Sequence, residues 1–276
     1  MAFLNKVRGG SQVCNRAVVV SVKDFDPGVE LARRKGVGRD AKRLHKVLSR
    51  LGFKVKIHND PTAQEIYSLF EEESKKTVES SFIGIISSHG EEGVVFGADG
   101  NRVRLSRIFG FFNGPTMVDK TKLFFVQACR GHDLDSGVDI QTDSVSFSDE
   151  DDYVFDYLSI PVDTAVMYAT APGYSAFMHP LGSVFIQTLC DLLEEDGGRD
   201  LEINRIMTRL NYQVAFHFQA RGRELAGKKE MPCFVTRLTK EVYPFRDSQR
   251  NIEELSEKLS TTVVEKSHNI RKRSIS

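Results

Sequence analysis

The sequence has no long apolar run and no excess of either charge. No segment approaches the roughly 18 consecutive apolar residues that a membrane-spanning helix needs. The first ten residues hold only scattered apolar side chains, so they do not form a secretory signal. The chain has 38 basic and 38 acidic residues. We therefore expect no membrane association and no nucleic-acid partner.

The sequence also has few cysteines. Cys14, Cys129, Cys190 and Cys233 are far apart and form no CxxC pair, which argues against a disulfide scaffold and against a zinc site. Free thiols fit a reducing compartment, so we predict a cytoplasmic location, with Cys190 and Cys233 in the core. The phosphate loops GxxxxGK[ST] and GxGxxG are missing as well, and we expect neither a cofactor nor a metal.

Short apolar runs alternate with amphipathic segments along most of the chain. This alternation predicts an α/β fold with right-handed crossovers and a mostly parallel sheet that is covered on both faces. Gly52 is expected to follow the end of the first helix, and Pro61 to open the second. The predicted strands are 16–22, 53–58, 81–87, 122–129, 165–169 and 231–238, and the predicted helices are 40–51, from 61 onward, 105–112, 183–193 and 201–218.

The strongest chemical signal is Gln127-Ala-Cys-Arg-Gly131, at the end of a buried strand. The carboxyl end of such a strand opens into the crevice where α/β sheets place their sites. His89 comes just past the end of the preceding strand, so neighbouring strands would bring it to the same edge as Cys129. An imidazole is suited to convert a thiol to thiolate at neutral pH. The N–H groups of Gly90 and Cys129 are candidates for an oxyanion hole.

This pentapeptide with an upstream histidine resembles the signature of the caspase family. The histidine lies 40 residues before the cysteine, against about 50 in that signature. The resemblance covers roughly residues 14–245 and is nearest to the effector caspases. It implies a three-layer sandwich built on a six-stranded, mostly parallel sheet flanked by helices. It also implies cysteine attack on the bond after aspartate, a role in apoptosis, and a dimer paired through the last strand.

The resemblance assigns further roles one residue at a time. Cys129, His89 and Gly90 match the nucleophile, the general base and acid, and the oxyanion donor. In the family, two arginines and a glutamine hold the substrate aspartate. Arg34 matches the first arginine and Gln127 the glutamine, with Ser88 as a neighbour. Bidentate cationic donors are what a carboxylate needs when it leaves water.

The segment 174–185 departs from the family pattern, which usually reads Tyr-Ser-Trp-Arg and then Gly-Ser-Trp-Phe. Ala176 replaces the first tryptophan, Phe177 the second arginine and Val184 the later tryptophan. The chain has no tryptophan at all, so no shift of register restores these rings. His179, neutral by default, is a poor substitute for the arginine. We therefore expect impaired recognition of aspartate and weaker apolar subsites.

The stretch between the Cys129 motif and the later strands is rich in aspartate, serine and glycine. Ile140-Gln-Thr-Asp-Ser144 resembles an effector-caspase maturation site, which an upstream initiator caspase would cleave after Asp143. An aspartate that occurs by chance in an acidic loop is the alternative. The predicted organisation is a leader (1–14), a caspase domain (15–245) and a C-terminal tail (246–276). Within the domain we expect a large subunit (about 15–143), a linker (about 130–160) and a small subunit (about 144–245).

Three functions compete on this sequence. We favour a pseudo-caspase or decoy caspase, with weak or no proteolysis, that regulates a competent paralogous caspase by dimerising with it. A fully active effector caspase, which would form a homodimer, is the second hypothesis, supported by the dyad, Arg34 and Gln127. The third is a cysteine peptidase of altered specificity, in which Phe177 forms an apolar wall.

Overall fold

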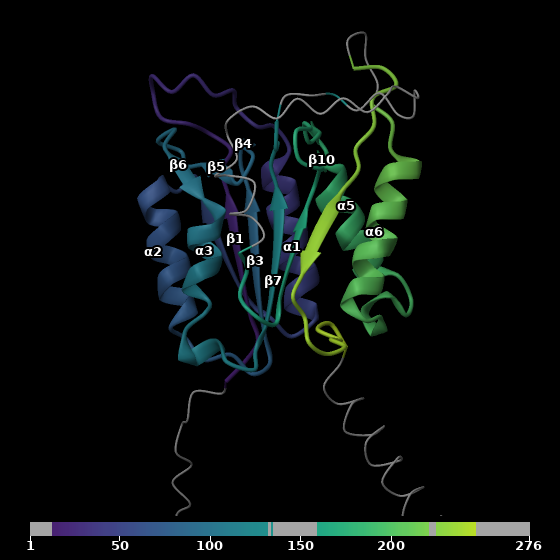
Figure 1. The fold of residues 1–276 in the computed structure, drawn as a ribbon. Coiled ribbons are helices and arrows are strands. Elements are labelled where there is room, and N and C mark those ends of the chain that lie inside the picture. Colours follow the sequence, from purple (N-terminus) through teal and green to yellow (C-terminus); the bar gives the residue numbers. More distant parts are fainter. Residues whose placement is uncertain (1–12, 132–133, 135–158, 221–224, 247–276) are drawn as a thin grey trace, which may run out of the picture.

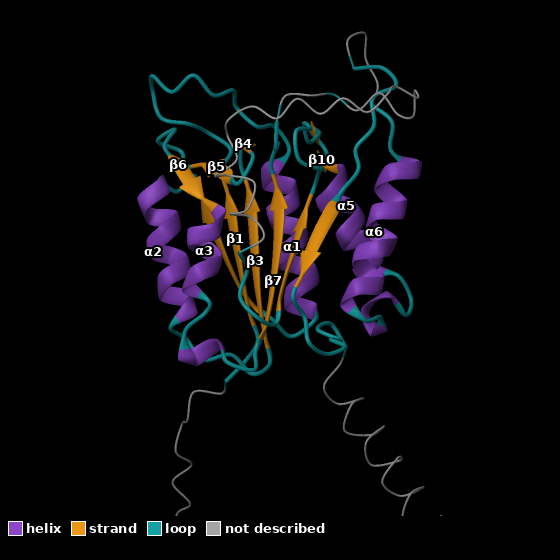
Figure 2. Cartoon of the chain, in the orientation of Figure 1, coloured by secondary structure: helices purple, strands orange, loops and turns teal. Residues whose placement is uncertain are grey.

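A computed structural model describes residues 13–131, 134, 159–220 and 225–246 of the chain. Its centre is a six-stranded sheet with strand order β11-β8-β7-β3-β1-β2 (Figures 1 and 2). β11 runs antiparallel to β8, and all other neighbours are parallel. The predicted fold class is confirmed. The strands are β1 (Arg16–Ser21), β2 (Lys54–Asn59), β3 (Ser81–Ser87), β7 (Thr121–Gln127), β8 (Thr164–Tyr168) and β11 (Cys233–Thr236).

Helices cover both faces of the sheet, which gives three layers (Figure 2). Val19 of β1 packs into one core, and Val18 and Val20 pack into the other. Because side chains alternate along a strand, a run of consecutive apolar residues serves both cores. The first core is closed by α1 (Val37–Arg50), α5 (Val184–Glu194) and α6 (Ile203–His217), and the second by α2 (Ala63–Ser74) and α3 (Leu105–Phe111).

Two small sheets that the sequence did not predict lie near the carboxyl ends of the parallel strands (Figure 1). One is antiparallel and three-stranded, and the other is a tight hairpin. Strands of two or three residues are too short to show an alternating pattern. The first sheet consists of β4 (Gly90–Glu91), β5 (Val94–Phe96) and β6 (Arg102–Arg104), and the hairpin of β9 (Met178–His179) and β10 (Gly182–Ser183).

Several element ends differ from the predictions by a few residues. The predicted start of the second helix at Pro61 is wrong, because Thr62 caps the helix: its side chain accepts the N–H of Glu65, and the Glu65 carboxylate accepts the N–H of Thr62. Gly52 follows α1 with φ +83°, as expected at this left-handed position. The predicted last strand is too long, since β11 keeps only Cys233–Thr236.

Candidate active site

The parallel pairing of β3 with β7 brings the two sequence motifs to the same edge of the sheet. Ser87 lies opposite Gln127 in this register, and His89 and Cys129 each follow their strand by two residues. Both side chains line one cavity of about 310 Å³. Cys129 is half-buried there and accessible to a ligand. The lining residues are Arg33, Arg34, Lys35, Ser88, His89, Gln127, Ala128, Cys129, Ala176, Met178 and Pro180.

The imidazole of His89 is held by the loop that follows β1. Its Nε2 lies 2.7 Å from the carbonyl oxygen of Ala32, and its ring centroid is 5.4 Å from that of Phe25. Because a carbonyl can only accept, Nε2 carries the proton and Nδ1 keeps a free lone pair. Burial lowers the pKa of His89, the Ala32 carbonyl partly opposes this, and Arg34 lowers it further. The ring is therefore neutral at pH 7 and can take a proton.

The thiol of Cys129 packs against the backbone of Ala176. The amide nitrogen of Ala176 lies 3.4 Å from Sγ and donates to it. Gly90 lies beside the cysteine loop, and a Cβ there would come within 2.7 Å of the Val94 carbonyl oxygen and 2.8 Å of the Ala128 Cβ. The glycine is thus required by the close approach of the two motif loops. Gly90 itself is not among the described residues that line the Cys129 cavity, and its role as an oxyanion donor with Cys129 stays a prediction.

Arg34 is the buried cation of the cavity. Its Nη1 donates to the Val22 carbonyl at 2.7 Å, and its Nη2 to the Ser87 hydroxyl at 3.1 Å. Burial lowers its pKa to about 10, which still leaves it charged at neutral pH, and the nearby Cys129 and Asp40 oppose the shift. Among the described residues that line the cavity, none is acidic. An anionic side chain fits this surrounding better than a neutral one.

Gln127 and Ser88 also line the cavity, as the sequence suggested. Gln127 is fully buried, and its Oε1 has no hydrogen-bond partner within the described part of the chain. The Ser88 hydroxyl donates to the Phe96 carbonyl at 2.5 Å and so anchors the His89 loop to β5. Gln127 can therefore contribute to a ligand site, whereas the Ser88 side chain already has a structural partner.

The three altered positions lie in different surroundings. Ala176 and Met178 line the Cys129 cavity, whereas Phe177, between them, packs its ring 5.2 Å from that of Phe218. Alternation along an extended segment explains why the middle side chain points away. Val184 begins α5 and lines a separate cavity, of about 270 Å³, together with Phe218. Phe177 therefore supplies no group to the Cys129 cavity.

His179 and Asp143 are the two remaining residues to which the sequence analysis gave a possible role. His179 accepts the N–H of Leu181 at Nδ1 within the β9–β10 hairpin, and it does not line the Cys129 cavity. It therefore supplies no group to that cavity. Asp143 lies outside the described residues, as do most of the predicted linker and nearly all of the leader and tail.

Arg130 connects the two motif loops, a role that sequence reasoning missed. Its Nη2 lies 2.6 Å from Glu92 Oε1, and its guanidinium carbon lies 4.2 Å from the centre of the Tyr168 ring. It also donates to Cys233 Sγ at 3.1 Å. The prediction of Cys233 as a core residue holds in part: it packs against the core, but its thiol is half-buried and faces a buried charge. A signal existed, because each motif carries one residue of the ion pair.

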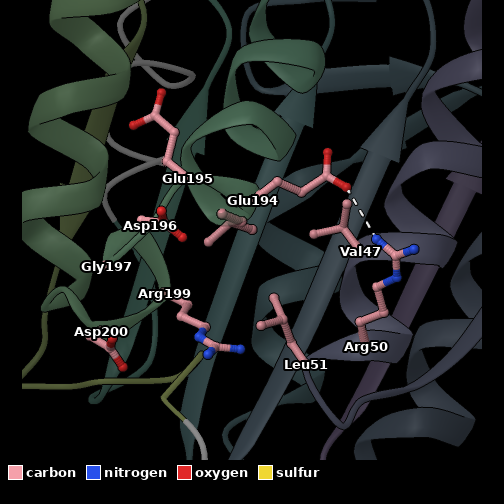
Figure 3. A pocket seen from close by; sticks show the side chains of 10 residues that line it. Val47, Arg50, Leu51, Glu194, Glu195, Asp196, Gly197, Arg199 and Asp200 are labelled. Carbon is pink, nitrogen blue, oxygen red and sulfur yellow. Dashed lines mark ion pairs between the residues drawn. The ribbon is translucent and has the colours of Figure 1, made fainter.

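A larger cavity, of about 480 Å³, lies between the C-terminal ends of α1 and α5 and the turn that follows α5. Figure 3 shows its charged lining, with Arg50 pointing toward Glu194 at 3.6 Å. It contains no thiol or imidazole. Throughout the described ranges, no three His, Cys, Asp or Glu side chains are placed to hold a metal ion, and no helix has the length and apolarity to cross a membrane.

Comparisons with known proteins identify the family to which this geometry belongs. Residues 14–243 match the family model described as Caspase domain. The chain is 38% identical over 234 residues to Caspase-3 of Bos taurus, covering 82% of each protein. It is 37% identical over 238 residues to Caspase-7 of Gallus gallus, covering 83% of this chain and 76% of that protein. The chain belongs to the caspase family and is a homologue of its effector cysteine proteases.

Proposed function

We propose that this chain is a pseudo-caspase with little or no proteolysis, which regulates a competent caspase in the cytoplasm by dimerising with it. The observation that supports this most strongly is the direction of Phe177, which packs on Phe218 and leaves Arg34 as the buried arginine of the cavity. When a desolvated carboxylate loses one of its charged partners, the binding free energy falls by about 2–5 kcal/mol. That corresponds to a loss of roughly 30-fold to several thousand-fold in binding.

The free edge of the sheet supports a dimer. β11 pairs with β8 on one side and has no neighbouring strand on the other within the described residues. The first three side chains of β11 are half-buried and that of Thr236 is exposed. Met231, two residues before the strand, is 44% exposed. An uncovered edge strand is a template for pairing with another chain. A second copy or a paralogous caspase fits this edge.

A second candidate is a protease that remains active. It is favoured by the basic lining of the cavity, to which Arg33 and Lys35 add exposed positive charge beside Arg34. Met178 and Pro180 add apolar surface, which suits a substrate residue other than aspartate. In either case, an upstream caspase that cleaves after Asp143 is part of the proposal.

Cleavage of aspartate-containing peptides by the purified protein separates these functions. We expect turnover at least about 30-fold below that of a competent caspase. When increasing amounts of this chain are added to such a caspase, we expect the cleavage rate of that caspase to change and then to reach a plateau. The Cys129→Ala variant of this chain should have the same effect. Robust turnover that Cys129→Ala abolishes would contradict the regulatory function. Cleavage of a peptide library after another residue would favour altered specificity.

A further inference from the structure

Glu230 is a buried carboxyl group that the proposed chemistry does not use. It lies three residues before β11 and is 1% exposed. Its Oε2 accepts the N–H of Phe177 at 2.7 Å, and its Oε1 is buried with no hydrogen-bond partner among the residues that the structure describes. Burial raises the pKa of this carboxyl to about 8, although the Phe177 N–H partly opposes the shift. The neutral acid is therefore the main form at pH 7.

The described surroundings give Glu230 no counter-ion. Of the two lysines that precede it, Lys228 and Lys229, the second donates Nζ to the carbonyl of Phe218 at 3.0 Å. From α6, the ring of His217 packs on that of Tyr212. No charged side chain of the described part contributes to the pKa shift of Glu230. As far as the described residues go, ionisation would leave a charge without a counter-ion beside the Phe177 backbone, and such buried charges are costly.

The hydrogen bond to Glu230 fixes the segment 174–178 from the side opposite the thiol. The N–H of Ala176 points to Cys129 Sγ at 3.4 Å, and the next N–H, that of Phe177, points to Glu230. Successive N–H groups of an extended segment point to opposite sides. Glu230 and Cys129 thus hold consecutive amides of one segment. The same segment supplies Ala176 and Met178 to the cavity wall.

We propose that Glu230 is a positioning residue, which holds the segment 174–178 against Cys129 as an uncharged carboxyl group and releases it on ionisation. Because the charged carboxylate is more stable in water than in this buried site, the cavity wall then loosens as the pH rises from the ordinary carboxyl range to about 8. The inference rests on the proposed function only in taking Cys129 as the reactive group. Glu230→Gln keeps a neutral acceptor for the Phe177 N–H, whereas Glu230→Leu removes the acceptor.

Hydrogen exchange of the peptide that contains residues 174–178 tests this proposal in the full-length protein. The ratio of the wild-type rate to the Glu230→Gln rate at one pH cancels the intrinsic pH dependence of exchange. We expect this ratio to rise by at least roughly tenfold between about pH 5 and about pH 8 and to level off above that, because the held segment disfavours the ionised carboxyl from its ordinary pKa up to the raised one. The Leu variant should exchange fast at every pH. Alkylation of Cys129, measured by mass spectrometry, should change in parallel.

A ratio that stays constant over this range would overturn the proposal, as would a folded Leu variant that is protected like the wild type. Should the Leu variant fail to fold by circular dichroism, the comparison with Glu230→Gln alone decides. Neither measurement needs turnover, so the test holds for an inactive protein. Peptide cleavage that depends on Cys129 would contradict the regulatory function and leave the result on Glu230 intact.

Discussion

Phe177 is the residue whose replacement most directly tests the incomplete cavity. We expect Phe177→Arg to raise kcat/KM on aspartyl peptides by about tenfold, equivalent to about 1.4 kcal/mol, because the longer arginine side chain can turn from the Phe218 side toward the substrate carboxylate. Recovery should remain partial, since Ala176 still leaves the cavity wall without a ring. Steady-state kinetics of Phe177→Arg, Ala176→Trp and the double variant measure this. Full activity in the single arginine variant would show that the lost tryptophan is unimportant.

The ion pair between Glu92 and Arg130 should matter for stability as well as for the shape of the site. Arg130 is 3% exposed, so Glu92→Gln leaves a buried charge without its carboxylate partner. We expect a loss of about 3 kcal/mol in the free energy of unfolding, measured by urea denaturation.

A neighbouring residue provides the control for that variant. Glu91 pairs with Arg102 at 2.8 Å, with side chains 38% and 61% exposed. Exposed pairs contribute at most about 1 kcal/mol, so Glu91→Gln should change little. If the two substitutions lowered the free energy of unfolding equally, burial of the Arg130–Glu92 pair would not increase its contribution to stability.

The sequence predicted where Cys129 and His89 lie better than it predicted the contacts around them. Cys129 and His89 could be placed because each follows a recognisable buried strand, and neighbouring parallel strands end at one edge. The contact between Arg130 and Glu92, and that between Glu230 and Phe177, join residues from separate segments. The two motifs do carry Arg130 and Glu92, but no local pattern shows that either pair meets, because both contacts depend on how loops pack after the sheet has formed.

At the scale of elements, Glu73 ties α2 to the first two strands of the chain. Its carboxylate meets Arg16 of β1 at 2.6 Å, Lys56 of β2 at 3.0 Å and Lys76 at 2.8 Å. Burial by itself would raise the pKa of Glu73, but the hydrogen bonds from Lys76, Lys56 and Arg16 outweigh it and lower the pKa to about 2. The folded state therefore favours the ionised form.

This shift predicts a pH-dependent contribution to stability. Because the folded pKa lies below the unfolded value, the stabilisation is present above pH 4.5 and is lost as the pH falls toward 2. Glu73→Gln should cost about 3 kcal/mol at pH 7, and its difference from the wild type should shrink through that acid range. Denaturation curves at several pH values measure this. In the exposed control Glu71→Gln we expect little change, and a pH-independent cost of Glu73→Gln would contradict the prediction.

Elements of moderate length were predicted well, and short ones were not. β3 has the predicted bounds, and β1 and α5 shift by a residue, since continuous apolar runs and a clear apolar face mark them. β4 and β9 have two residues each. Each pairs with a strand only a few residues further along the chain, and runs this short show no alternating pattern in the sequence.

For the whole molecule, the free edge of β11 predicts how a dimer is disrupted. The N–H of Arg237 donates to the carbonyl of Thr164 in β8. Because successive N–H groups of a strand point to opposite sides, the N–H of Thr236 faces away from the sheet. Thr236→Pro should therefore leave the β8 ladder intact and remove a donor from the free edge. Light scattering after gel filtration should show a shift from dimer to monomer.

Thr236→Val is the matched control, because it keeps the amide and the branched shape. It should associate like the wild type. An unchanged dimer in the proline variant, with the fold preserved by circular dichroism, would place the interface elsewhere on the surface.

The order of the sheet has a consequence for the chain once it is nicked. β7 and β8 are adjacent, paired strands, yet 36 residues separate the end of one from the start of the other. A cut anywhere in that connection leaves both new ends outside the ladder, while β8, α5 and α6 stay packed in cores shared with β1 and β7. The two pieces should co-migrate on a native gel and separate only in detergent, so backbone scission would change the covalent structure without dissociating the particle.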